Sequence, residues 1–245
     1  MIQATAGTQP VSATGALGTV RGSMRRHPAW WVVPAAAAAW VLMAVPPQPH
    51  AGHHGHAPVR GGDALATLAM IVAMMLPLAV PSIRHVARST SRRYGAMACF
   101  LAGYLAVWML VMLAITAAWT FTASLAGWTA AAVGAVAVAA LWEVAPARQR
   151  HARRCDRTVP LARAGWRAHA DCARYGVTSG IACAGTCWAL MAVCVAFTHS
   201  LPVMAVLFGV QVGARYGGLS PRFAALAVLA VGAVAVAVRL AAAHA

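Results

Sequence analysis

The stretch AMACFLAGYLAVWMLVMLAITAAWTFTASLAGWTAAAVGAVAVAALWEVA, residues 96–145, contains a single charged side chain, that of Glu143. A helix needs about 20 apolar residues to cross the ~30 Å hydrocarbon core of a bilayer. Fifty residues are therefore enough for two crossings. We expect transmembrane helices at about 96–121 and 125–145, the second of which ends at Pro146.

The composition of the whole chain also indicates a membrane protein. Of its 245 residues, 61% are hydrophobic and only 9% are charged, whereas about a quarter of the residues of a soluble domain are charged. We expect an all-α, polytopic transmembrane bundle of about seven helices. Its other five apolar segments are residues 30–45, 64–83, 176–198, 201–214 and 222–240. The first of these resembles a signal peptide, but no small-residue cleavage site follows it, so we expect a retained anchor.

The arginines predict the orientation, because basic residues in short loops gather on the cytoplasmic side of a membrane. All nineteen basic residues are arginines. With a cytoplasmic N-terminus, only Arg60 and Arg239 fall outside, and the other seventeen fall in inner segments. An Ala-rich chain without lysine is consistent with a bacterium of high GC content. We therefore expect a multi-pass protein of the bacterial plasma (inner) membrane.

The apolar segments and the charges together divide the chain into two parts. Residues 1–27 are small and polar and are expected to form a disordered cytoplasmic tail. Residues 28–245 form the transmembrane domain. Within it, residues 46–63 are an outer His-rich loop, and residues 146–175 are an inner Arg-rich loop.

Several function classes are excluded by composition. The net charge of +15 follows from loop arginines, and the chain has no motif for reading bases and no basic stripe interleaved with aromatic residues, so we expect no nucleic-acid partner. The absence of lysine excludes a Walker A phosphate loop and Schiff-base chemistry. We therefore expect no ATP-driven activity of the chain alone.

Four histidines within seven residues mark the outer loop, and they are His50, His53, His54 and His56. Separated by Gly and Ala, they form a flexible multidentate ligand for Cu, Zn or Ni. The alternative interpretation is a polar linker that happens to be rich in histidine.

Three cysteines follow one face of the segment at 176–198. At ~100° per residue, Cys183, Cys187 and Cys194 fall within about 40° of one another. Cys183 and Cys187 lie ~6 Å apart along the axis and can share one ion, whereas Cys194 lies ~10 Å further on. Packing is the alternative role, because free Cys is often buried as a small hydrophobic residue.

Methionines provide further soft ligands on the segment at 64–83. Met70 and Met74 share a helix face, and Met75 adjoins them. Thioethers and thiolates favour Cu(I), and Met74 and Cys187 are both expected near the middle of the membrane. Core filling is the usual role of each methionine taken alone.

Two other groups of polar residues are candidates for function. Glu143 is an ionisable group inside an apolar segment and is therefore a functional candidate, although it is equally suited to pair with Arg148. In the inner loop, Cys155 and Cys172 have His151 and His169 beside them. These four side chains are a candidate for a tetrahedral metal site, and a reduced thiol pair is the alternative.

Residues 64–216 resemble a bacterial family of metal-binding integral membrane proteins that are often described as copper chaperones. The resemblance rests on five pieces: AMMLP (73–77), GYLAVW (103–108), WE (142–143) with Pro146, RRCDRT (153–158) and CAGTCWALM (183–191). The last is the most specific. The resemblance implies a metal-handling role, with copper favoured and Cys183, Cys187, Met74 and Met75 as candidate ligands.

The sequence departs from the family pattern at three places. Many members have adjacent cysteines where this chain has Thr186 and Cys187, and a Glu-Lys pair where it has Ala214 and Arg215. A histidine common after the inner-loop cysteine is Asp156 here. If those groups belong to an ion path, the activity of this chain is reduced or altered.

The favoured function is therefore the binding and delivery or transport of a soft metal, Cu(I) before zinc, without enzymatic activity. Expected partners are the lipid bilayer and a metal donor or acceptor protein. One alternative is an accessory subunit of a larger membrane complex, with no metal site of its own. The other is a membrane thiol oxidoreductase that uses Cys183 and Cys187, although a disulfide between positions i and i+4 of a helix is strained.

Overall fold

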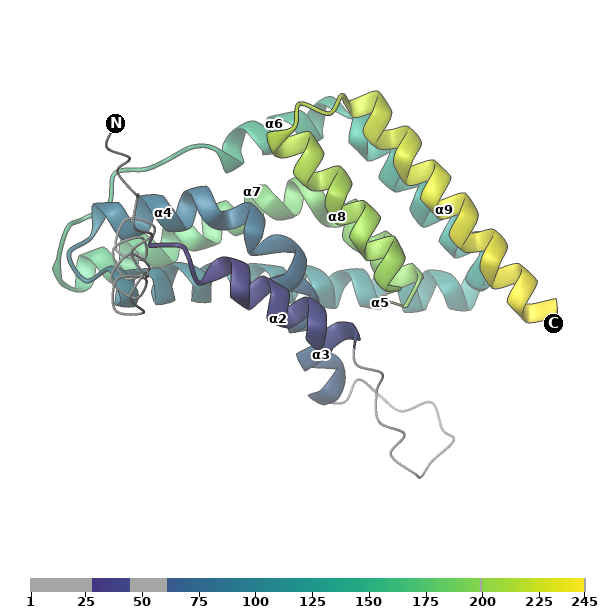
Figure 1. Cartoon of the computed structure of the whole chain (residues 1–245), viewed down its shortest axis with the longest axis horizontal. Coiled ribbons are helices and arrows are strands. Elements are labelled where there is room, and N and C mark those ends of the chain that lie inside the picture. Colours follow the sequence, from purple (N-terminus) through teal and green to yellow (C-terminus); the bar gives the residue numbers. More distant parts are fainter. Residues whose placement is uncertain (1–27, 45–60, 199, 245) are drawn as a thin grey trace, which may run out of the picture.

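The computed structural model describes residues 28–44, 61–198 and 200–244, and every regular element within these residues is helical (Figure 1). The elements are α2 (Val32–Ala44), α3 (Gly61–Met75), the short 3₁₀ helix η1 (Pro77–Ala79), α4 (Val80–Ser89), α5 (Arg93–Val144), α6 (Pro146–Cys155), α7 (Gly165–Ala196), α8 (Leu201–Tyr216) and α9 (Pro221–His244). The predicted N-terminal tail, and the outer histidines 50–56, lie outside the described residues.

Three of these helices are long and apolar enough to cross a membrane, namely α5, α7 and α9. A fourth candidate is the pair formed by α3 and the η1–α4 segment, bent by 45° at the Leu76–Pro77 break. Pro77 and Pro81 account for the break, because proline removes a helical N–H and clashes with the preceding turn. The all-helical fold class is confirmed for the described residues, and the apolar helices suggest membrane association by their length and composition. Helices α2 and α8, with 13 and 16 residues, are apolar but shorter.

Helix α5 is two helices joined at Gly127. It has 52 residues, and Gly127 has a φ of 78° and a ψ of 159°, far from helical values. A left-handed φ of this kind favours glycine. The sequence placed a boundary at residues 121–125, a few residues from this break. The part after Gly127 packs against α9, where Gly232 contacts the Val136 side chain.

The inner loop is more ordered than the sequence suggested. Residues 146–155 form α6, which Pro146 begins at a favoured first-turn position, and α7 starts at Gly165 rather than near residue 176. The Arg-rich inner loop expected at 146–175 from hydropathy therefore includes α6 and the first turns of α7. Helices can continue beyond the apolar layer, where arginine side chains reach water.

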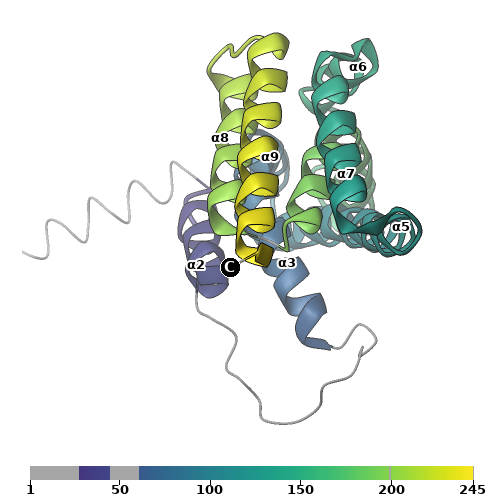
Figure 2. The ribbon, with the colours of Figure 1, turned by 90° about the vertical axis from the view of Figure 1, so that its right-hand side faces the viewer.

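Close packing of α5 against α7 forms the centre of the molecule, and glycines make it possible. A Cβ on Gly180 would lie 3.0 Å from Val107 Cβ, and one on Gly103 would lie 2.5 Å from the Ala173 carbonyl oxygen. Gly176 and Gly180 form a GxxxG pattern, which lets membrane helices approach closely. Figure 2 shows α8 and α9 running side by side next to this pair.

Candidate metal centre

The cysteine face of α7 is turned into the protein. Cys183 and Cys187 are 7% and 5% exposed, and Cys194 is fully buried. The hydroxyl group of Tyr104 on α5 donates to Cys183 Sγ at 3.2 Å and also lies 3.3 Å from the Met75 carbonyl oxygen. The Cys183 thiol is therefore held where α3, α5 and α7 meet.

A third thiol reaches the same place from α6. Cys155, the last residue of α6, is buried, and its sulfur lies 3.7 Å from Thr186 Oγ1 on α7. A hydrogen bond with the Cys183 thiol, and then burial, raise the pKa of the Cys155 thiol well above its ordinary value. The thiol is therefore protonated at neutral pH, and a metal ion that bound it would displace a proton.

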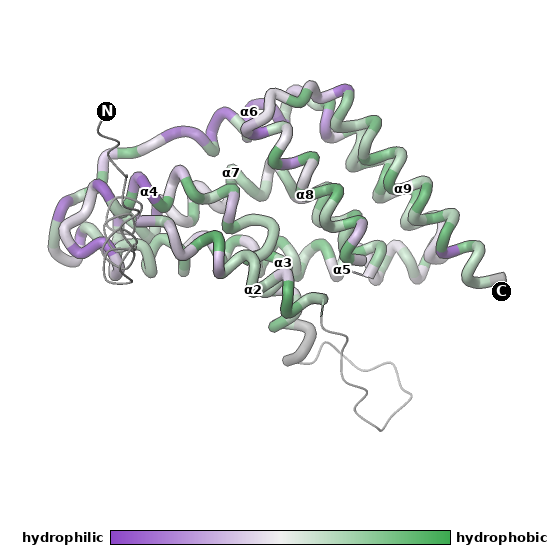
Figure 3. Tube along the Cα trace, in the orientation of Figure 1, coloured by the Kyte–Doolittle hydropathy of each residue, from purple (hydrophilic) through white to green (hydrophobic). Residues whose placement is uncertain are grey.

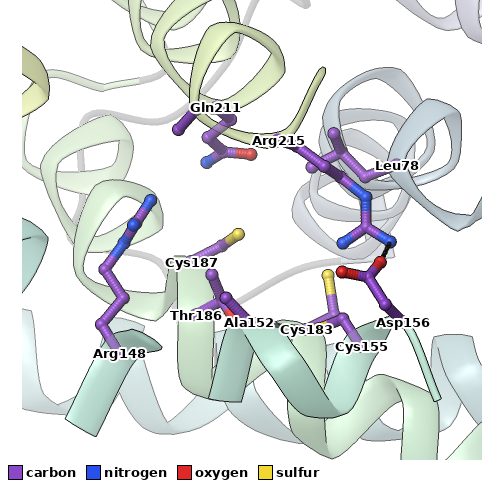
Figure 4. A pocket seen from close by; sticks show the side chains of 11 residues that line it. Leu78, Arg148, Ala152, Cys155, Asp156, Cys183, Thr186, Cys187, Gln211 and Arg215 are labelled. Carbon is purple, nitrogen blue, oxygen red and sulfur yellow. Dashed lines mark hydrogen bonds and ion pairs between the residues drawn. The ribbon is translucent and has the colours of Figure 1, made fainter. Parts of the chain in front are cut away.

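The three thiols line one cavity of about 120 Å³, which we call the thiol pocket (Figure 4). Its wall is built from η1, α6, α7 and α8, and its lining residues are Leu78, Arg148, Ala152, Cys155, Asp156, Cys183, Thr186, Cys187, Gln211, Ala214 and Arg215. A single water needs about 10–15 Å³ of such space. The pocket therefore has room for an ion and for small movements of its ligands.

Two ion pairs border the thiol pocket. Arg148 Nη2 lies 2.9 Å from Glu143 Oε2 in a contact that lacks hydrogen-bond angles, and both residues are buried. Arg215 Nη2 donates to Asp156 Oδ1 at 2.9 Å, and the Asp156 side chain is 70% exposed. The pairing of Glu143 with Arg148, one of the two roles considered for Glu143, is confirmed.

Gln211 is the polar residue that the sequence analysis missed. It lies in α8, is 3% exposed, and neither its amide oxygen nor its amide nitrogen has a hydrogen-bond partner. In Figure 4 this amide comes from α8 and points toward the pocket that Cys187 also lines. A polar residue inside the short apolar segment 201–214 was the signal that could have identified it.

Other candidates lie outside the thiol pocket. Met70, Met74 and Met75 are completely buried, and Cys194 lies nearly two turns beyond Cys187 on α7. None of these side chains lines the pocket. The possible role of the methionines and Cys194 as ligands stays a prediction.

The proposed inner-loop site of Cys155, Cys172, His151 and His169 does not form. Within residues 28–44, 61–198 and 200–244, no three His, Cys, Asp or Glu side chains are arranged to hold a metal ion. Cys172 lies near Cys99, and His169 lies against Gly95. Cys155 instead contacts α7, and eleven residues of helix place Cys172 about 16 Å from Cys183 along the axis.

A comparison with protein families matches residues 65–240 to the PpoB2 family of copper chaperones. The chain belongs to this family. The resemblance drawn from the five sequence pieces is thereby confirmed. No curated protein and no solved structure matches the chain.

Within this copper chaperone family, the departures noted in the sequence converge in space. Asp156, Thr186, Ala214 and Arg215 come from three separate segments, yet all line the thiol pocket. The positions at which the sequence analysis expected departures from the family pattern therefore surround the same three thiols.

Proposed function

We propose that this protein binds Cu(I) through Cys183 and Cys187 and delivers it, without catalysis, to an acceptor protein. The observation that carries the proposal is the pair of buried thiols, one helical turn apart, that face a cavity. Thiolates are soft ligands and favour Cu(I). The copper chaperone family name supports the choice of copper over zinc.

The positive charges of the arginines around the pocket favour a Cu(I) ion bound by thiolates. A Cu(I) ion between two thiolates carries a net charge of −1, and the guanidinium groups of Arg148 and Arg215 both line the pocket. A bound cation favours deprotonation of its thiol ligands. Metal loading therefore creates a buried anion beside two cations, which reduces the electrostatic penalty of burial.

The metal content of the purified protein tests the function. We expect one copper per chain in anaerobically purified, Cu(I)-loaded wild type, and at least a tenfold loss of bound copper in Cys183→Ala/Cys187→Ala. A variant in which His50, His53, His54 and His56 are replaced tests the outer loop, which we propose collects or releases the ion, and should keep the membrane-bound copper. Wild type that binds no copper would exclude the proposal and favour an accessory subunit.

We further propose seven crossings of the bacterial plasma membrane with a cytoplasmic N-terminus. Support comes from the distribution of hydrophilic residues, which gather along the left and upper edges of Figure 3, at the end of α4 and around α6. Helix α5 then crosses twice, with Gly127 on the outer side. The two shorter helices, α2 and α8, each provide one more of the seven crossings.

Reporter fusions test this topology. Alkaline phosphatase, active only outside the plasma membrane, should be active when fused after residue 244 and inactive when fused at residue 160, between α6 and α7. The reason is that seven crossings place the two fusion points on opposite sides. Equal activity at both points would contradict the proposal, and a cytoplasmic fluorescent reporter gives the converse control.

A further inference from the structure

We infer that Cys155 is the third ligand of the copper ion, so that the thiol pocket is a three-thiolate Cu(I) site assembled from α6 and α7. The inference rests on the proposed function and extends it by a ligand from a different element. The spacing along the chain alone does not link Cys155 to the pair on α7, because Cys155 lies 28 positions before Cys183.

The first support is the position of the three sulfurs. Cys155 packs against α7 with its sulfur 3.7 Å from Thr186 Oγ1, Cys187 lies one turn beyond Cys183, and all three thiols line the same cavity. They are not yet in a coordination arrangement. A change of staggered rotamer moves a cysteine sulfur without moving the backbone, and the cavity provides the space for it. Copper binding can therefore draw the thiols together.

The second, independent support is the group of unpartnered polar atoms around the cavity. Both polar atoms of the Gln211 side chain lack partners, as do Nε of Arg148 and Nε of Arg215. Buried polar groups in native proteins are nearly always paired, and an unpaired one destabilises the fold. Several such donors around one cavity indicate a bound group that accepts hydrogen bonds. Thiolate sulfur accepts them.

Charge also fits a third thiolate. Cu(I) with three thiolates has a net charge of −2, and the Arg215 guanidinium lines the same pocket as Cys155. Its carboxylate partner, Asp156, is 70% exposed, and solvent weakens an ion pair to an exposed carboxylate. Arg215 can therefore turn from Asp156 toward the metal-bound sulfurs at little cost.

The number of sulfur atoms bound to copper tests the inference. We expect X-ray absorption spectra of the Cu(I)-loaded full chain to show three sulfur neighbours in wild type and two in Cys155→Ser. Copper affinity, measured by competition with a Cu(I) chelator, should fall in Cys155→Ser by at least the ~10–100-fold that loss of an outer-shell partner causes. Gln211→Leu should keep three sulfurs and bind ~10–100-fold more weakly.

Cys172→Ser is the matched control, since Cys172 is a fully buried thiol of α7 outside the pocket, and it should behave as wild type. Two sulfurs in wild type, or unchanged affinity in Cys155→Ser, would overturn the inference while leaving the Cys183–Cys187 pair intact. A Cys155–Cys183 disulfide in anaerobically prepared protein would also overturn it. If the wild-type protein binds no copper at all, the proposed function itself is excluded.

Discussion

Replacing Gly176 by alanine is expected to destabilise the protein by about 3 kcal/mol or more, the upper range for overpacking a well-packed site. A Cβ at this position would overlap the Phe100 carbonyl oxygen and lie 2.9 Å from the Phe100 carbonyl carbon. These are backbone atoms of α5, and they cannot move aside as a flexible side chain can. The helices must separate, and the packing between them is lost.

The measurement is the unfolding midpoint of the detergent-purified variant, together with the amount of protein recovered from membranes. Gly134→Ala is the matched control, because Gly134 is also helical but has nothing within 4 Å of its added Cβ. Alanine favours a helix over glycine by about 1 kcal/mol, so this variant should be as stable as wild type or more so. An unchanged midpoint for Gly176→Ala would show that α5 and α7 do not pack this closely.

The close contact between α5 and α7 at Gly176 explains why the thiol pocket depends on residues far from it. Gly176 and Gly180 set the distance between α5 and α7, and Tyr104 then reaches Cys183 across that interface. Gly185, two residues beyond Cys183, leaves room for the His151 ring of α6, since a Cβ there would lie 2.6 Å from His151 Cγ. Small residues therefore bring α5 and α6 up to the thiol-bearing part of α7.

The sequence predicted the apolar helices and the common face of Cys183 and Cys187 on α7, because hydropathy and helical periodicity are local properties. The break in α5 fell near the predicted boundary, and Cys183 and Cys187 do share a cavity. Local patterns do not report which helix packs against which. For that reason Cys155 was grouped with Cys172, its neighbour in the chain, rather than with Cys183.

Gln211 and Arg215 show a second limit of sequence reasoning. In sequence, Gln211 is one polar residue in an apolar segment, and Arg215 is one of many arginines that indicate topology. Only the fold shows that both face three thiols and carry unpartnered atoms. Whether a polar group is unpartnered depends on its neighbours in space, and no spacing rule supplies them.

Removing Arg148 is the other substitution with a large expected effect, because it leaves the Glu143 carboxylate buried without its cation. Glu143 has no exposed surface, and Arg148 is its ion-pair partner at 2.9 Å. Breaking a buried pair from one side typically destabilises a protein by about 3–5 kcal/mol. Arg148→Leu should therefore lower the unfolding midpoint strongly, as measured in the detergent-purified protein.

A double variant shows whether Arg148→Leu destabilises the protein through the unpaired charge of Glu143 or through the loss of packing by the Arg148 side chain. Replacing both partners, Glu143→Leu/Arg148→Leu, should restore most of the stability, since apolar replacement of a whole buried pair is often neutral or stabilising. Asp156→Asn removes the exposed partner of Arg215 and should destabilise the protein less than Arg148→Leu does, since solvent screens the Asp156 carboxylate. If the double variant is as unstable as Arg148→Leu, the Arg148 side chain acts through packing around the thiol pocket, and the buried charge of Glu143 is not the cause.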